Sequence, residues 1–221
     1  MIHSCVKSGR YLLKVAAAAR LVRAGGLLIY PTETFFALGG LAADALAVKR
    51  VYAVKMRPAS SPLPIIAATL AQLNAVVCLE TAPHALLHHF WPGALTVLLP
   101  ARPSLPAALV NAQGKAAVRI SPHPWARALA LAAGGALTAS SANISGHQSA
   151  RALTQLEPAL LDKVDGVLTA CPTTAGGLPS TLVEPCGDGL LRVLRRGAVP
   201  CEALEGAGYT LISNACSGGA R

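Results

Sequence analysis

The chain has 221 residues, of which 53% are hydrophobic and only 13% are charged, and this length fits one large domain or at most two small ones. Its formal net charge of +9 comes entirely from residues 1–151, where 14 Lys and Arg residues stand against three acids. We expect that part to attract polyanions such as nucleotides or RNA, although a basic surface kept for solubility is the alternative.

Three long windows lack charged residues, at 58–79, 81–101 and 128–150. Each is long enough to cross a bilayer, which takes about 20 apolar residues, but prolines, histidines or polar runs interrupt all three. We therefore expect no membrane segment. Basic residues also interrupt the amino-terminal region where an export signal would lie, and the six cysteines are dispersed. These features predict a cytoplasmic protein with reduced thiols.

An amphipathic pattern from Ser8 to Ala24 predicts a first helix, which the following two glycines should end. The apolar run Leu27–Tyr30 then predicts a short strand that stops at Pro31. Asp44 is suited to cap a second helix, which runs to about residue 55.

Short apolar runs in the rest of the chain predict strands, separated by a short helix capped by Thr69 and a longer helix over 123–133. The strands are expected at 63–67, 94–99, 116–120, 136–140, 166–169, 181–184 and 190–194. This alternation predicts an α/β fold with a mixed sheet. No repeat or linker divides the chain, so we expect one domain over 8–206 and a flexible tail over 207–221.

Polar and basic residues follow several predicted strands and helices, and ligands of α/β proteins bind at such positions. Pro31-Thr32-Glu33-Thr34 could bind an amine, a hydroxyl or a metal ion, but a capped turn is the simpler explanation. Lys55 and Arg57 could clamp phosphate groups or could merely complement a helix dipole. This segment lacks the GxxxxGK[ST] pattern, which excludes an ordinary P-loop.

Arg119 lies near the end of the strand predicted at 116–120. An unpaired buried charge is costly, and too few acids lie nearby in the sequence to make an internal ion pair the obvious partner. We therefore expect an anionic ligand at Arg119. Ser180 and Arg195 repeat the combination of a hydroxyl and a guanidinium near the ends of later strands.

The segment 140–146 is rich in small and hydroxyl residues and includes Ser141 and Asn143. Such a loop can bring backbone N–H groups close to a phosphate, and Arg151 follows closely enough to add positive charge.

His84 and His88 have the spacing of two metal ligands on a helix. No third ligand is evident, so we expect no metal site.

Taken in order, seven short motifs resemble the whole motif series of the YrdC-like family. They are Pro31-Thr32-Glu33-Thr34, Lys55-x-Arg57-Pro58, Trp91-Pro92-Gly93, Ala117-Val118-Arg119, Ser141-Ala142-Asn143-x-Ser145-Gly146, Pro179-Ser180-Thr181 and Arg195-x-Gly197. The resemblance runs from about residue 25 to residue 197. It implies a single twisted α/β domain with a mixed sheet around a basic concave cleft.

The resemblance also implies an activity, a nucleotidyl transfer that makes threonylcarbamoyl-adenylate and pyrophosphate from L-threonine, bicarbonate and ATP. Mg²⁺ would accompany ATP, and the product would serve threonylcarbamoyladenosine formation in tRNA through partner proteins. Direct contact with tRNA stays open. The residues implied for L-threonine are Thr32, Arg119, Ser141 and Ser180. Those implied for ATP are Lys55, Arg57, Asn143, Arg151 and Arg195, of which Lys55 and Arg57 would be catalytic.

Two residues depart from the family pattern, because Phe36 and Ala37 stand where Tyr and Gly are usual. The missing hydroxyl and the added methyl group should alter the shape of the threonine pocket.

Two other functions stay open at this point. One is a non-catalytic module that binds double-stranded RNA or tRNA, although only 4% of the residues are aromatic. The other is carbamoyl-adenylate chemistry with a different acceptor.

Overall fold

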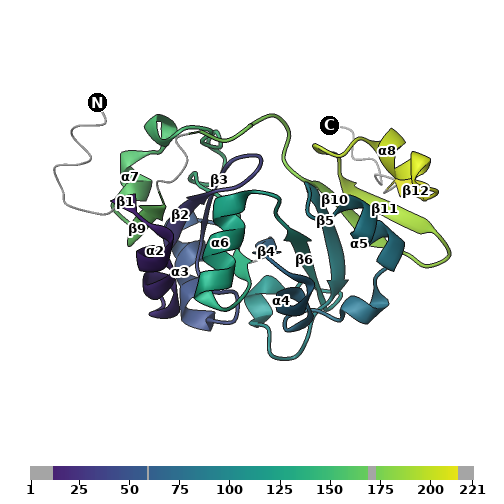
Figure 1. Ribbon diagram of the computed structural model, residues 1–221, viewed down its shortest axis with the longest axis horizontal. Coiled ribbons are helices and arrows are strands. Elements are labelled where there is room, and N and C mark those ends of the chain that lie inside the picture. The colour runs from purple at the N-terminus through teal and green to yellow at the C-terminus, as the bar shows by residue number, and fades with distance from the viewer. Residues whose placement is uncertain (1–11, 59, 169–172, 214–221) are drawn as a thin grey trace.

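The computed structural model describes residues 12–58, 60–168 and 173–213, and within them the strands form two mixed sheets (Figure 1). One sheet has the order β1 (Leu12–Leu13), β9 (Gly166–Leu168), β2 (Leu28–Pro31), β3 (Phe36–Gly39) and β8 (Ser140–Ser141). The other has the order β12 (Thr210–Ser213), β11 (Leu190–Arg195), β10 (Thr181–Pro185), β5 (Leu95–Pro100), β6 (Lys115–Ile120), β4 (Ile65–Ala67) and β7 (Leu137–Thr138). The predicted α/β mixed-sheet class is confirmed.

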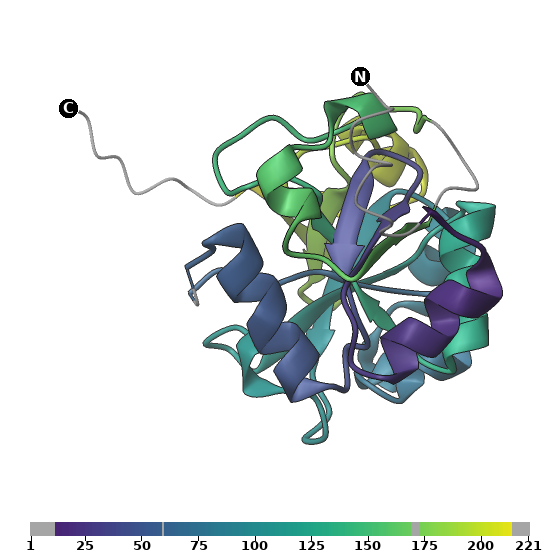
Figure 2. The same cartoon turned by 90° about the vertical axis from the view of Figure 1, so that its left-hand side faces the viewer.

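The helices cover both faces of the central strands. They are α2 (Val15–Arg23), α3 (Ala45–Lys55), α4 (Leu70–Asn74), α5 (His84–Phe90), α6 (Pro124–Ala133), α7 (Pro158–Leu161) and α8 (Cys201–Gly206). Figure 2 shows α3 on one side of the strands and α2 on the other. Ile29 and Ile65 accordingly belong to the core cluster that includes α3, whereas Leu28 and Ile66 pack with α2 and α6. This alternation is the period of two expected of strands buried on both faces.

A single extended segment joins the two sheets. Its first part, β7, pairs with β4, and its second part, β8, pairs with β3. Between them, the N–H of Thr138 donates to the carbonyl of Gly40 at 3.0 Å, and the N–H of Ala139 donates to the carbonyl of Pro64 at 2.8 Å. The sequence predicted one strand over 136–140 within one sheet. The structure corrects this, because the hydrogen bonds of the segment are divided between strands of both sheets.

The first predicted helix begins later than expected. Leu12 and Leu13 form β1, which pairs in parallel with β9, so α2 starts only at Val15 and residues 8–11 lie outside the described ranges. The sequence analysis also missed β3. This strand pairs antiparallel with β2, and the register places Pro31 opposite Phe36.

Asp44 caps α3 as predicted, because its carboxylate accepts hydrogen bonds from two backbone N–H groups of the first turn, at 2.9 and 3.0 Å. Thr69 likewise caps α4. Helix α3 ends at Lys55, and Met56 follows in the left-handed conformation with a φ of 51°. This turn separates the buried Lys55 from Arg57, which reaches the pocket described below.

The seven-stranded sheet extends past residue 206, where the sequence predicted the domain to end. Strand β12 lies within 207–221, the predicted flexible tail, but it pairs in parallel with β11, and Leu211 packs against the core. Residues 214–221 lie outside the described ranges. None of the described helices is long and apolar enough to span a membrane.

Candidate active site

Six of the predicted site residues line one pocket, whose volume is about 320 Å³. They are Thr32, Arg57, Arg119, Ser141, Ser180 and Arg195. Both sheets contribute to its wall, because the turn between β2 and β3 and the strand β8 come from one sheet, and β6 and β11 from the other. Residues that are far apart in the sequence therefore meet where the two sheets adjoin. The other lining residues are Thr34, Phe35, Phe36, Ala37, Pro64, Ala139, Ser140, Ser149 and Pro179.

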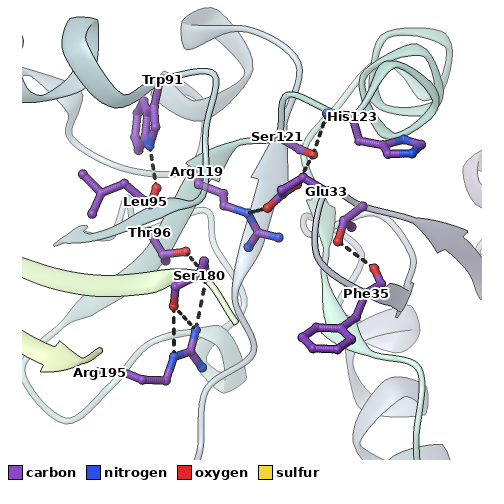
Figure 3. Close-up of polar contacts among 11 residues, drawn as sticks. Glu33, Phe35, Trp91, Leu95, Thr96, Arg119, Ser121, His123, Ser180 and Arg195 are labelled. Carbon is purple, nitrogen blue, oxygen red and sulfur yellow. Dashed lines mark hydrogen bonds and ion pairs between the residues drawn. The ribbon is translucent and has the colours of Figure 1, made fainter. Parts of the chain in front are cut away.

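Arg119 is buried in the pocket wall and is paired with an acid of the chain itself. Its Nε donates to one carboxylate oxygen of Glu33 at 2.9 Å, and the hydroxyl of Ser121 donates to the other at 2.6 Å (Figure 3). The sequence analysis did not expect this ion pair, because Glu33 and Arg119 are 86 residues apart. No described residue accepts a hydrogen bond from the two terminal nitrogens of Arg119, so these remain available to a ligand.

Arg195 lies at the rim of the pocket and binds Ser180. Its Nε and Nη2 donate to the carbonyl oxygen of Ser180 at 3.1 and 2.9 Å, and Nη2 also contacts the Ser180 hydroxyl at 3.1 Å. That hydroxyl shares a further hydrogen bond of 2.8 Å with Thr96. Figure 3 shows Arg119 in the space between this group and Glu33. The hydroxyl and the guanidinium that the sequence analysis noted near the ends of later strands are thus in contact with each other.

Arg57 completes a group of three guanidiniums, and its Nε donates to the carbonyl of Ser61 at 2.8 Å. Partial burial and the nearby charges of Arg119 and Arg57 lower the pKa of Arg195, which indicates that the three cations repel one another. In the part of the chain that the structure describes, Glu33 is the one acid that forms an ion pair with any of them. An anionic ligand would therefore relieve an excess of positive charge.

Thr32 lies in the turn between β2 and β3, where its hydroxyl and its N–H donate to the carbonyl of Phe35 at 2.7 and 3.1 Å. The capped turn that the sequence favoured is therefore present, and it places Thr32 in the pocket wall. The carbonyl of Thr34 accepts hydrogen bonds from the Thr174 hydroxyl and the Gly176 N–H, both at 2.8 Å. These bonds fasten the segment that leads to β10 and Ser180 onto the turn.

Lys55 and Asn143 are not among the residues that line the pocket, and they lie behind its wall. Lys55 is only 1% exposed, and its ammonium donates to the carbonyl oxygens of Ser141 and Asn143 and to the side-chain oxygen of Asn143. These contacts fix the segment that carries Ser141. The structure therefore gives both residues a positioning role, and direct contact with phosphate stays a prediction.

Arg151 also lies outside the lining residues and is exposed. Its Nη2 donates to the carbonyl of Ala175 at 3.3 Å, and a Cβ atom on Gly176 would come within 1.9 Å of its Nε. Arg151 therefore packs against Ala175 and Gly176, and Gly176 in turn contacts Thr34. The structure does not bring it to the three guanidiniums, and its predicted contact with ATP stays a prediction.

Sequence reasoning missed Ser121 and Ser149 as parts of the site. Ser121 directly follows β6, so the rule that selected Arg119 from the end of a strand could have found it. Ser149 has no comparable signal, because it lies in a loop that only the tertiary structure brings to the pocket. Phe36 and Ala37 also line the pocket, and Phe36 is fully buried. Their effect on amino-acid specificity stays a prediction.

Comparison with known proteins gives a consistent result. The Sua5/YciO/YrdC family model, which is described as telomere recombination, matches residues 20–197. The threonylcarbamoyl-AMP synthase of Stenotrophomonas maltophilia is 37% identical over 185 residues, covering 81% of this chain and 98% of that protein. The threonylcarbamoyl-AMP synthase of Bacillus subtilis is 35% identical over 196 residues, covering 87% of this chain but 56% of that protein.

Solved structures agree with this result. P. abyssi Sua5 complexed with L-threonine matches with a TM-score of 0.80 at 32% identity, covering 87% of this chain and 56% of that one. E. coli YciO matches with a TM-score of 0.76 at 22% identity, covering 86% and 92%, which shows the fold alone. The chain thus spans little more than half of the longer relatives. Because the family model matches most of its length, the chain belongs to the Sua5/YciO/YrdC family.

Proposed function

We propose that this protein catalyses the threonylcarbamoyl-AMP synthase reaction, in which L-threonine, bicarbonate and ATP form threonylcarbamoyl-adenylate and pyrophosphate. Relatives with 35% and 37% identity carry that name, and a solved relative binds L-threonine. The names of these relatives support a synthase over the alternative of a non-catalytic RNA-binding module.

The observation that carries this proposal is the gathering of Arg57, Arg119 and Arg195 at one pocket with hydroxyl groups between them. The reactants bring a carboxylate, bicarbonate and a triphosphate, and the intermediate is a carbamate, so all of these groups are anionic. Arginine binds such groups bidentately, so a pocket with three guanidiniums and one paired acid suits them well. A protein that binds only the exterior of RNA has no need of a concave site of this kind.

The chemistry requires positioning more than it requires a reactive side chain. The threonine nitrogen, as the free amine, attacks the carbon of bicarbonate, and water leaves to give the carbamate. A carbamate oxygen then attacks the α-phosphorus of ATP and displaces pyrophosphate. We assign the carboxylate of threonine to Arg119, with Thr32, Ser141 and Ser180 around the amino acid. Arg57 and Arg195 are assigned to the phosphates, where fixed positive charge stabilises the transition state.

Mg²⁺ is part of the proposal only as the companion of ATP. Magnesium prefers carboxylate oxygens, and both oxygens of Glu33 are engaged by Arg119 and Ser121. No group of three or more His, Cys, Asp or Glu side chains that could hold a metal occurs among the described residues. The pocket therefore does not fit a magnesium ion held by protein carboxylates, and we assign no step to one.

We further propose that the adenylate passes to separate proteins that modify tRNA, with direct tRNA contact through the basic residues of 1–151. Association with tRNA should weaken steeply as salt is raised, since it would depend on phosphate contacts.

The test is the release of pyrophosphate from ATP by purified protein, with and without L-threonine and with and without bicarbonate. Release that requires both is the expected result. Release that does not depend on threonine would indicate another acceptor for the carbamoyl group. Absence of release from folded protein in every condition would overturn the proposal in favour of a binding module.

The activity should also depend on the protonation of Lys55. Burial, assisted by the charge of Arg57 and opposed by that of Glu157, lowers the pKa of Lys55 to about 8. The ammonium has three N–H donors for its three acceptors, whereas the neutral amine, which prevails above that pKa, has two. We therefore expect kcat/KM to fall as pH rises through about 8, because the segment that carries Ser141 loosens.

A pH–rate profile of the wild type and of Lys55→Met checks this prediction. Methionine is similar in length but does not titrate, so the variant should be slow at every pH and should lack the alkaline limb. A fall of equal size in both proteins would assign the limb to a different group.

A further inference from the structure

Glu33 does not itself line the pocket, but it contacts Arg119 and is therefore placed to control how that residue of the pocket wall is oriented. It lies in the turn between β2 and β3 of the five-stranded sheet, whereas Arg119 belongs to β6 of the seven-stranded sheet and Ser121 directly follows that strand. The Glu33–Arg119 ion pair therefore bridges the two sheets at the pocket. The two side chains are only 13% and 6% exposed, so solvent screens their interaction little.

Both carboxylate oxygens of Glu33 are used. One accepts from Arg119 at 2.9 Å, and the other accepts from Ser121 at 2.6 Å. The Ser121 hydroxyl is itself held by the backbone N–H of His123, at 3.2 Å, and Ser121 is fully buried. Glu33 therefore has a fixed orientation, because each of its two oxygens accepts a hydrogen bond from a buried residue of the other sheet or directly after it.

The consequence for Arg119 follows from the planarity of the guanidinium. Because Nε is bound to Glu33, the plane and direction of the group are set, and its two terminal nitrogens are directed away from Glu33 (Figure 3). That is the edge with which arginine binds a carboxylate bidentately. Without Glu33, the nearby charge of Arg195 would tend to displace the guanidinium from this position.

We propose that Glu33 is a positioning residue that orients Arg119 for the carboxylate of the amino-acid substrate and so determines the affinity for that substrate. The inference rests on the proposed function and extends it, since Glu33 acts through Arg119 and touches no reacting atom. It also predicts a selective effect, because the guanidiniums assigned to ATP do not contact Glu33.

The experiment measures L-threonine binding by calorimetry and the KM values for L-threonine and ATP by pyrophosphate release. Glu33→Ala should raise the Kd and KM for L-threonine roughly 10- to 100-fold, as expected when a recognition group is misplaced, and should change the KM for ATP little. Glu33→Gln keeps an oxygen for Arg119 Nε and should restore most of the affinity. Ser121→Ala should have an intermediate effect.

Glu184→Ala is the matched control. Glu184 is similarly buried and bridges two cations, Lys115 and Arg192, at 2.6 and 2.7 Å, but neither of these cations lines the pocket. This variant should lose stability without a change in the KM for L-threonine. An equal rise in KM for Glu184→Ala and Glu33→Ala would reduce Glu33 to a merely structural role and overturn the inference.

A double variant separates action through Arg119 from independent action. In the Arg119→Ala background, Glu33→Ala should add no further loss of L-threonine affinity, whereas an additive loss would contradict the inference. If wild-type protein neither binds L-threonine nor turns it over, the proposed function fails and this inference fails with it. If the wild type does both and Glu33→Ala binds L-threonine as tightly, only the inference is wrong.

Discussion

Arg195→Ala is expected to lower kcat/KM for pyrophosphate release by roughly 100- to 1000-fold, the loss typical of removing one group that stabilises transition-state charge. The guanidinium lies at the pocket rim beside the Ser180 hydroxyl, and it forms one of a group of three cations. Alanine removes both the charge and the hydrogen bonds that fix Ser180. Initial rates at saturating L-threonine and bicarbonate, with ATP varied, measure the effect.

The matched control for this variant is Arg196→Ala. Arg196 is the next residue in the sequence and is exposed, and it does not line the pocket. Both variants lose one positive charge, so a general electrostatic effect would slow them equally. Circular dichroism should confirm that both are folded. Comparable activity of the two variants would show that Arg195 has been wrongly assigned to the site.

Gly39→Ala is expected to destabilise the protein by about 3 kcal/mol or more, or to prevent folding, since overpacking against an immobile neighbour is costly. Gly39 ends β3 where the two sheets touch. A Cβ atom there would lie 1.7 Å from the carbonyl oxygen of Thr138 and 2.7 Å from its carbon. Because those atoms belong to backbone, the clash can be relieved only if the strands that line the pocket move apart. Urea unfolding of wild type and variant measures the change.

Gly206→Ala provides the comparison. Gly206 ends helix α8, and a Cβ atom there would meet nothing within 4 Å. The free energy of unfolding of this variant should therefore rise by about 0.4 to 1 kcal/mol, because alanine favours the helix and restricts the unfolded chain. A Gly39→Ala protein with the same unfolding midpoint as Gly206→Ala would contradict the close approach of the two sheets.

Local chemistry in the sequence correctly indicated several features of the fold. Asp44 and Thr69 are caps because a short polar side chain can reach the N–H groups two or three residues ahead, and that reach is independent of the rest of the chain. The strands predicted over 94–99 and 116–120 are present as β5 and β6, within one residue at each end. The resemblance carried by the ordered motifs also identified six of the residues that line the pocket.

The sequence by itself determined the α/β class, the helix caps and the basic and hydroxyl character of several residues that line the pocket, because each depends on short-range patterns. Only the tertiary structure decided the division of the strands into two sheets, since residues 137–141 find their partners in β4 and β3. It also decided that Arg119 pairs with Glu33 and that Lys55 is buried behind Ser141, contacts that span 86 residues each. Contacts over such separations follow from the packing of whole sheets, and no local pattern encodes them.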